Sequence, residues 1–187
     1  MRPLNLPNAI TLGRIILVPV IVVTMLGARR GGSPILPAAL VVAAALSDAL
    51  DGYLARRSDD VTNFGRIIDP IADKALIAGS LAVLAVQGRV AVWVASAIVG
   101  RELAVTVLRW LASRRGITIS VSRLGKNKTT LQVIAIVALI LAPDPYAWWT
   151  LALVYAALAL TLASGAEYFA GAFSARGGGR EAPERSP

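Results

Sequence analysis

The sequence predicts an all-α integral membrane protein with six transmembrane helices. Of its 187 residues, 56% are hydrophobic, and the mean hydropathy of +0.67 is too high for a soluble domain of this size. Apolar runs recur along the chain, most of them near the ~20 residues that a helix needs to cross a bilayer. These runs are 8–27, 34–55, 66–87, 90–112, 129–142 and 146–173, of which the fifth is short. We therefore expect one transmembrane domain over residues 1–173.

The six runs differ in the polar residues that they carry. Arg14 interrupts the first run and further runs follow it, so we expect a retained span and not a cleaved signal peptide. The second and third runs each contain two aspartates, and a basic segment joins the fourth run to the fifth. After the sixth run, residues 174–187 show no apolar periodicity and are expected to form a disordered cytosolic tail.

The basic residues set the expected orientation. Arg29, Arg30 and Arg89 follow the first and third runs, whereas the rest of the 19 Lys and Arg residues fall at the opposite ends of the spans. The positive-inside rule then places both termini in the cytoplasm. The net charge of +8 is spread over short loops without interleaved stacking aromatics, so we expect no nucleic-acid partner. These cations can orient the chain, attract anionic headgroups and hold an anionic substrate.

Four aspartates lie in two of the apolar runs. Asp48 and Asp51 are three residues apart and Asp69 and Asp73 are four apart, so each pair shares one helix face. Ionised carboxylates at membrane depth are costly, so we expect cations or water beside them. The chain has no His and no Cys, and clustered oxygen ligands favour hard divalent ions such as Mg, Mn or Ca. We expect two ions, Mg or Mn, a pair that can clamp the attacking and leaving oxygens of a phosphoryl transfer.

The residues around these acids complete a longer pattern. It reads DxxDGxxARx(8)GxxxDxxxD from Asp48 to Asp73, with all eight fixed positions filled. This block resembles the signature of the CDP-alcohol phosphotransferases. The resemblance implies a membrane enzyme of six helices, usually a homodimer, that moves a phosphoryl-linked lipid group from a CDP-linked donor to an alcohol and releases CMP.

The resemblance also implies roles for individual residues. Asp48, Asp51 and Asp69 would hold metal, and Asp73 would be both a metal neighbour and the general base for the acceptor hydroxyl. The pocket for the cytidine diphosphate group would be lined by Gly52, Ala55, Arg56 and Gly65, with Asn8 and Thr11 of the first run. Gly52 and Ala55 can instead serve close helix packing, and Asn8, Thr11 and Arg14 can serve as a helix cap followed by an interfacial anchor.

Two further segments bear on the alcohol acceptor. Residues 5–14 are similar to the openings of bacterial phosphatidylglycerophosphate synthases and of the cardiolipin synthases of the family. The pattern GKxKTxxQ over residues 125–132 looks like the phosphatidylglycerophosphate synthase branch, whose acceptor is sn-glycerol 3-phosphate. A dianionic phosphate calls for several cations, and the candidates are Arg101, Arg109, Lys126 and Lys128. Each of them can instead serve the positive-inside bias, and Glu102 can neutralise Arg101 or contribute to the pocket.

The two resemblances therefore imply phosphatidyl transfer from CDP-diacylglycerol to sn-glycerol 3-phosphate, which we expect in a bacterial cell (inner) membrane, with the active site at the cytoplasmic side of the bundle. Two alternatives keep the fold and change the acceptor: a cardiolipin synthase that uses phosphatidylglycerol, and a phosphatidylinositol phosphate synthase that uses inositol phosphate. A third is a cation-coupled transporter whose aspartates bind the coupling ion.

Overall fold

A computed structural model describes the backbone of residues 6–58, 63–114 and 124–177 and the side chains of 13–47, 72, 74–112, 114 and 128–170. The described backbone forms six helices and no strand: α1 (Leu6–Arg29), α2 (Ile35–Ser58), α3 (Asn63–Val86), α4 (Val92–Arg114), α5 (Leu124–Leu141) and α6 (Trp148–Gly177). The prediction of an all-α fold with six helices is thus confirmed. Helix α6 continues to Gly177, past the predicted start of the tail at Ser174.

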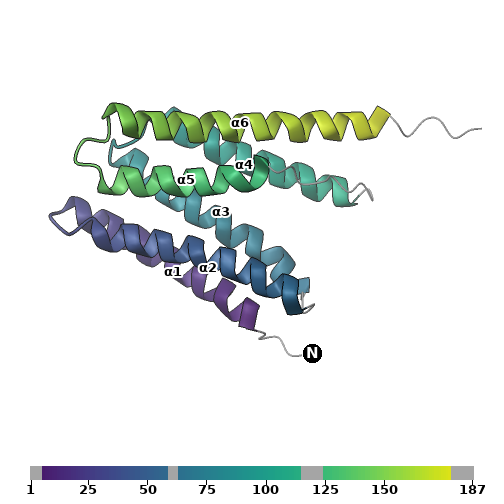
Figure 1. Cartoon of the computed structure of the whole chain (residues 1–187), viewed down its shortest axis with the longest axis horizontal. Coiled ribbons are helices and arrows are strands. Elements are labelled where there is room, and N and C mark those ends of the chain that lie inside the picture. Colours follow the sequence, from purple (N-terminus) through teal and green to yellow (C-terminus); the bar gives the residue numbers. More distant parts are fainter. Residues whose placement is uncertain (1–5, 59–62, 115–123, 178–187) are drawn as a thin grey trace, which may run out of the picture.

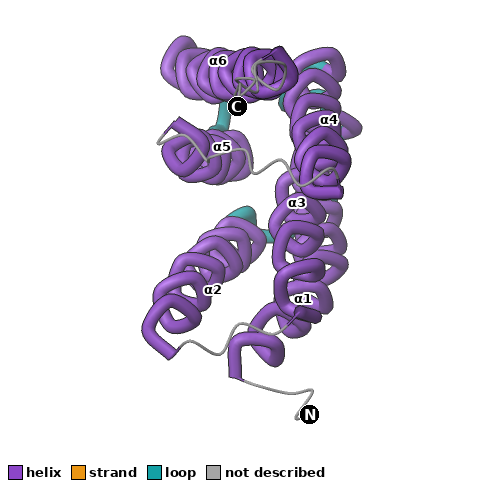
Figure 2. The backbone as a smooth tube through the Cα atoms, turned by 90° about the vertical axis from the view of Figure 1, so that its right-hand side faces the viewer, coloured by secondary structure: helices purple, strands orange, loops and turns teal. Residues whose placement is uncertain are grey.

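Consecutive helices run in opposite directions along the bundle (Figure 1). One end therefore gathers the starts of α1, α3 and α5 and the ends of α2, α4 and α6, and we call it the motif end. The other, the short-loop end, is closed by the connections 30–34, 87–91 and 142–147. Helix α3 contacts α1, α2, α4 and α5, while α6 packs on α4 and α5. Figure 2 shows α1, α3 and α4 in one row, with α2 and α5 facing them.

The core of the bundle is apolar, and all six helices contribute to it. Its fully buried members include Ile21 of α1, Val41 of α2, Leu84 of α3, Val94 of α4 and Ile136 of α5. Small residues among the buried positions let neighbouring helices approach closely. This core holds the helices at fixed positions, and the polar residues described below are placed relative to it.

The outer surface of the bundle is also rich in large apolar side chains. Exposed examples are Val23, Leu46, Val107, Ile134 and Leu162, one from each of five helices. Surfaces of this kind contact a membrane or a partner protein. Within the described residues, one segment, Trp148–Ala170, is long and apolar enough by itself to cross a membrane. Shorter apolar stretches are Ile35–Ser47, Lys74–Val86 and Lys128–Leu141.

The short-loop end is fastened by hydrogen bonds to helix carbonyls. Helix α3 ends in a Schellman motif, in which the N–H of Gly88 donates to Ala85 (3.0 Å) and that of Arg89 to Leu84 (2.9 Å). Gly88 has a φ of 71°, which favours glycine at this position. The Arg89 side chain donates from Nε to the carbonyl of Leu139 (2.6 Å) and from Nη2 to that of Ala142. Carbonyls that α5 leaves unpaired at its end thus receive donors from the chain that follows α3.

Candidate active site

The fold brings the predicted aspartates to one end of the bundle. Asp48 and Asp51 lie in the C-terminal half of α2, and Asp69 and Asp73 in the N-terminal half of α3. Helices α2 and α3 are in contact, and both halves belong to the motif end (Figure 1). Both segments are helical, so the two aspartates of each pair lie on the same face of their helix, as their spacing predicts. The convergence of the four carboxylates stays a prediction, because their side chains lie outside those that the structure describes.

The other predicted pocket residues share this location on the backbone. Gly52, Ala55 and Arg56 follow the aspartates on α2, and Gly65 precedes Asp69 on α3; Asn8 and Thr11 lie in the first two turns of α1 and Lys126 in the first turn of α5. Their side chains are likewise outside the described set. Among the described side chains, no group of three His, Cys, Asp or Glu residues could hold a metal ion. The metal site therefore stays a prediction as well.

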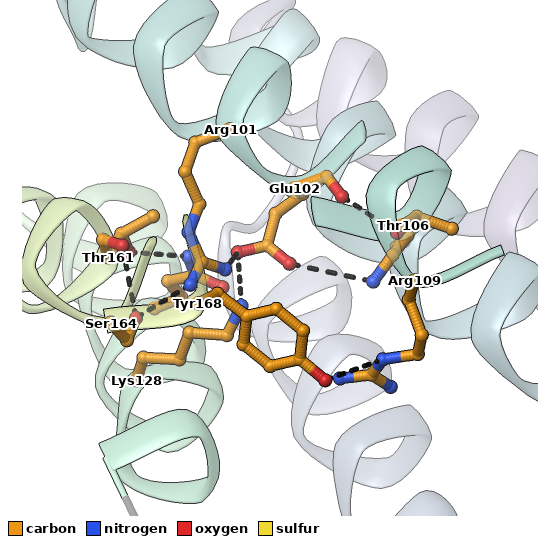
Figure 3. Close-up of polar contacts among 10 residues, drawn as sticks. Arg101, Glu102, Thr106, Arg109, Lys128, Thr161, Ser164 and Tyr168 are labelled. Atoms are coloured by element: carbon orange, nitrogen blue, oxygen red, sulfur yellow. Dashed lines mark hydrogen bonds and ion pairs between the residues drawn. The ribbon is translucent and has the colours of Figure 1, made fainter. Parts of the chain in front are cut away.

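A cluster of charged side chains is described around Glu102, near the middle of α4 (Figure 3). The Lys128 Nζ of α5 lies 2.5 Å from Glu102 Oε1, and the Arg101 Nη1 lies 2.8 Å from the same oxygen. The Lys74 Nζ of α3 lies 3.5 Å from Glu102 Oε2. We call these four residues the Glu102 cluster. Since Lys74 follows Asp73 directly, the backbone of α3 links this cluster to the aspartate motif.

Three of the four residues of the Glu102 cluster are largely shielded from solvent, whereas the side chain of Lys74 exposes 23% of its surface. Glu102 and Lys128 expose 8% and 9% of their surface, and the side chain of Arg101 exposes 8%. Three cations and one carboxylate carry a combined charge of +2. Charges this deeply buried are retained where they are paired or where they bind a ligand. One carboxylate pairs with all three cations but does not balance their charge.

Helix α6 supplies the neutral polar side of the same site. The Arg101 Nη2 donates to Ser164 Oγ (2.9 Å), and Ser164 Oγ donates in turn to the carbonyl of Thr161 (3.0 Å). One turn deeper on α5, Gln132 Nε2 donates to Thr161 Oγ1 (2.8 Å), and both side chains are buried. These bonds tie α4, α5 and α6 together beneath the charged cluster. Arg101 is therefore held at both ends of its guanidinium.

Arg109 does not join the Glu102 cluster in the described contacts. It lies eight residues beyond Arg101, which is about 12 Å along a helix. Its Nε donates to the Tyr168 hydroxyl of α6 (3.0 Å), and its guanidinium lies 5.2 Å from the centre of the Tyr168 ring. Of the four predicted acceptor cations, the structure thus brings Arg101 and Lys128 to one carboxylate and places Arg109 about two turns away.

Sequence reasoning did not assign Lys74, Ser164 or Thr161 to the site and left Glu102 undecided. A signal existed for two of them, because Lys74 and Glu102 are charged residues within apolar runs, the same argument that singled out the aspartates. Ser164 and Thr161 carry no such signal. Hydroxyl side chains in an apolar helix commonly bond to their own backbone, so a contact with another helix cannot be deduced from their presence.

Comparison with known proteins shows the family of the chain. Residues 4–163 match the model of the CDP-alcohol phosphatidyltransferase family. The match covers most of the chain, including both aspartate pairs and the Glu102 cluster. The chain belongs to this family.

Three curated relatives are similar to the chain over most of its length. A CDP-diacylglycerol–glycerol-3-phosphate 3-phosphatidyltransferase of Bacillus subtilis (strain 168) is 39% identical, over 88% of this chain and 93% of its own length. A probable phosphatidylglycerophosphate synthase of Mycobacterium tuberculosis (strain ATCC 25618 / H37Rv) is 38% identical, over 96% of this chain and 87% of its own. A protein of Salmonella typhi named like the first is 36% identical, over 90% and 94%.

Proposed function

We propose that this protein transfers the phosphatidyl group of CDP-diacylglycerol to sn-glycerol 3-phosphate, giving phosphatidylglycerol phosphate and CMP. The observation that carries the proposal is the Glu102 cluster, in which three helices gather a combined charge of +2 next to the aspartate-bearing segment of α3. A phosphate monoester brings up to two negative charges at neutral pH. The names of the curated relatives support the same pair of substrates.

The reaction needs a general base, a cation beside the diphosphate of the donor, and residues that bind the phosphate of the acceptor. Asp73 takes the proton of the 1-hydroxyl of glycerol 3-phosphate as that oxygen bonds to the β-phosphorus of the donor. The bond between this phosphorus and the oxygen bridging to the cytidine monophosphate breaks, and CMP leaves with the bonding electron pair. Arg56 is a fixed cation suited to the diphosphate of the donor. Lys128 and Arg101 hold the acceptor phosphate and so orient the attacking hydroxyl.

The four aspartates fit divalent metal. They offer oxygen donors alone, in a chain without His or Cys, which suits Mg or Mn better than zinc. Asp48, Asp51, Asp69 and Asp73 would hold two such ions, whose charge would offset that of the phosphates during transfer. The contact between α2 and α3 supports a shared site for both aspartate pairs.

The bundle is proposed to span a bacterial cell (inner) membrane six times, with both termini and the active site on the cytoplasmic side and with a second copy as partner in a homodimer. Exposed aromatic residues support two interfaces: Trp93 and Trp148 at the short-loop end, Trp110 and Phe169 toward the motif end. Trp93 and Trp110 are 17 residues apart on α4, about 26 Å along the helix, close to the thickness of a hydrocarbon core.

The experiment that tests the function is CMP release by the purified protein in detergent–lipid micelles containing CDP-diacylglycerol. Glycerol 3-phosphate, inositol phosphate and phosphatidylglycerol are compared as acceptors, each with Mg or Mn and with a chelator. We expect glycerol 3-phosphate to drive release, and we expect chelation to stop it without unfolding the protein. Release with another acceptor instead would reject the acceptor and keep the class of reaction. No release with any acceptor would reject the transferase and favour a transporter.

A further inference from the structure

The reaction itself does not require Glu102. This residue is an acid in a site that is proposed to bind an anion, so its presence needs another explanation. A carboxylate beside an acceptor phosphate repels it, so a pocket built for affinity alone would omit the acid. Yet Glu102 pairs with Lys74, Arg101 and Lys128, which come from α3, α4 and α5. Without this carboxylate, three neighbouring cations, two of them with largely buried side chains, would repel one another. Glu102 is thus the group that allows them to lie together.

The combined charge of the cluster matches one kind of ligand. With Glu102 ionised, the four side chains carry +2, which a dianionic phosphate monoester offsets completely and a phosphodiester offsets by half. In the proposed loaded site, two divalent ions would offset the charge of the four aspartates, which would leave the charge of the cluster for the acceptor. This reasoning rests on the proposed function, and it concerns how the acceptor is selected.

Arg101 is positioned from the other side by the backbone of α6. A Cβ atom on Gly165 would lie 2.9 Å from Arg101 Nε and 3.2 Å from its Cγ, so the arginine side chain would have to shift to make room for it. Ser164, the preceding residue, accepts a hydrogen bond from Arg101 Nη2 at 2.9 Å. The missing side chain of Gly165 therefore lets the arginine lie flat against α6, between that helix and Glu102. Gly100, the residue before Arg101, would meet nothing within 4 Å and serves no such purpose.

We propose that Glu102 and Gly165 are positioning residues for the acceptor phosphate: Glu102 holds Lys74, Arg101 and Lys128 as one unit of charge +2, and Gly165 provides the space that fixes Arg101 within it. The pair thereby selects a phosphate monoester over a phosphodiester. Neither residue touches the reacting atoms.

The decisive experiment compares two pairs of variants by steady-state kinetics of CMP release. Glu102→Gln removes the charge and keeps the shape; its control is Glu167→Gln, which changes an exposed acid of α6. Gly165→Ala introduces the clash with Arg101; its control is Gly100→Ala, an equal change in helix propensity with open space around it. The KM for glycerol 3-phosphate is measured at saturating donor, and the KM for CDP-diacylglycerol at saturating acceptor.

We expect Glu102→Gln to raise the KM for glycerol 3-phosphate at least about tenfold and Gly165→Ala about three- to tenfold, with kcat within about threefold and the donor KM within about twofold. Glu102→Asp should recover part of the loss, and both controls should match the wild type. Acceptor KM values within twofold of the wild type for Glu102→Gln and Gly165→Ala would overturn the proposal. An equal rise in the donor KM would overturn it too, because it would indicate general damage.

A second readout does not depend on turnover. Inorganic phosphate, added without donor, should raise the melting temperature of the wild type, and this gain should shrink in Glu102→Gln and in Gly165→Ala. No gain in the wild type would reject the cluster as a phosphate site. If the gain behaves as expected but glycerol 3-phosphate drives no CMP release, the positioning inference stands and the proposed acceptor falls. Should Glu102→Gln fail to fold, Gly165→Ala decides, since it leaves every ion pair partner in place.

Discussion

Two arginines at different places in the bundle show how differently this protein uses the same side chain. Arg89, at the short-loop end, donates to the carbonyls of Leu139 and Ala142, which lie at and just beyond the end of α5. Arg101, near the middle of α4, donates to Glu102 and to Ser164 and lies in a cluster that carries more positive than negative charge. The first arginine closes the end of a helix, and its contacts account for its presence. The second belongs to a group whose charge is left unbalanced by its contacts with the described side chains.

This contrast separates structural cations from binding cations. At the short-loop end, Arg29 also donates to a helix carbonyl, that of Val86, and Gln87 does the same to Met25. These side chains donate to carbonyl oxygens, which carry only partial negative charge. They therefore satisfy backbone acceptors at helix ends and do not attract a ligand strongly. In the Glu102 cluster, full charges are buried in unequal number. Substitutions in the two regions should therefore change different quantities, catalysis in the Glu102 cluster and stability at the short-loop end.

The largest expected effect lies in the aspartate motif itself. Asp73→Asn removes the proposed base and keeps the size of the side chain, so kcat should fall about a thousandfold, within the range that general bases contribute. The KM for CDP-diacylglycerol should change little. The control is Asp144→Asn at the short-loop end, where the exposed Asp144 accepts the N–H of Tyr146 (2.8 Å), a bond that an amide oxygen can still accept. An active Asp73→Asn protein would reject the assignment of the base.

A smaller effect is expected at Lys128. Its replacement by Ala removes one cation and leaves Arg101 and Lys74 to pair with Glu102, so the fold should persist. Hydrogen bonds to charged groups are worth about 1.5–3 kcal/mol, so the KM for glycerol 3-phosphate should rise about ten- to a hundredfold. The measurement is CMP release at saturating donor.

Arg114→Ala provides the comparison for Lys128→Ala. Arg114 is an exposed cation of α4 whose guanidinium lies 3.8 Å from the centre of the Trp110 ring, away from the Glu102 cluster contacts. If the cations act only by drawing anions to the surface, both substitutions should raise the acceptor KM alike. A specific phosphate site instead makes Lys128→Ala far more damaging than Arg114→Ala.

The same contrast explains what could be predicted from the sequence. The six helices were predictable because apolar runs report burial or lipid contact directly, and the aspartate motif because acids in such runs are costly. Lys128 was predictable as a candidate from its basic segment. Its pairing with Glu102 was not, because the contact joins residues 26 positions apart on different helices.

The placement of Arg101 against Gly165 and Ser164 of α6 could not be predicted from the sequence. Whether a glycine in an apolar helix serves general packing or one particular side chain depends on the crossing of the two helices. Gly100 and Gly165 are alike in sequence context, yet one faces open space and the other faces Arg101. The spacing of residues along one helix predicts which of them share a face. The distance between the faces of two helices depends on how those helices pack in the bundle.

The smallest expected effect on catalysis lies at Arg89, and it sharpens the comparison from the structural side. Arg89→Ala leaves the carbonyls of Leu139 and Ala142 without their donor, and an unpaired buried acceptor costs about 1–3 kcal/mol. The melting temperature in detergent should fall by several degrees, while the acceptor and donor KM values stay within about twofold of the wild type. Because α5 also carries Lys128 at its other end, a loosened α5 would instead appear as a raised KM for glycerol 3-phosphate. Thermal unfolding and kinetics on the same preparation distinguish the two outcomes. A lower melting temperature with unchanged KM values would show that the Glu102 cluster does not depend on the Arg89 contacts. A lower melting temperature together with a raised acceptor KM would show that the short-loop end holds α5 in the position that the Glu102 cluster needs.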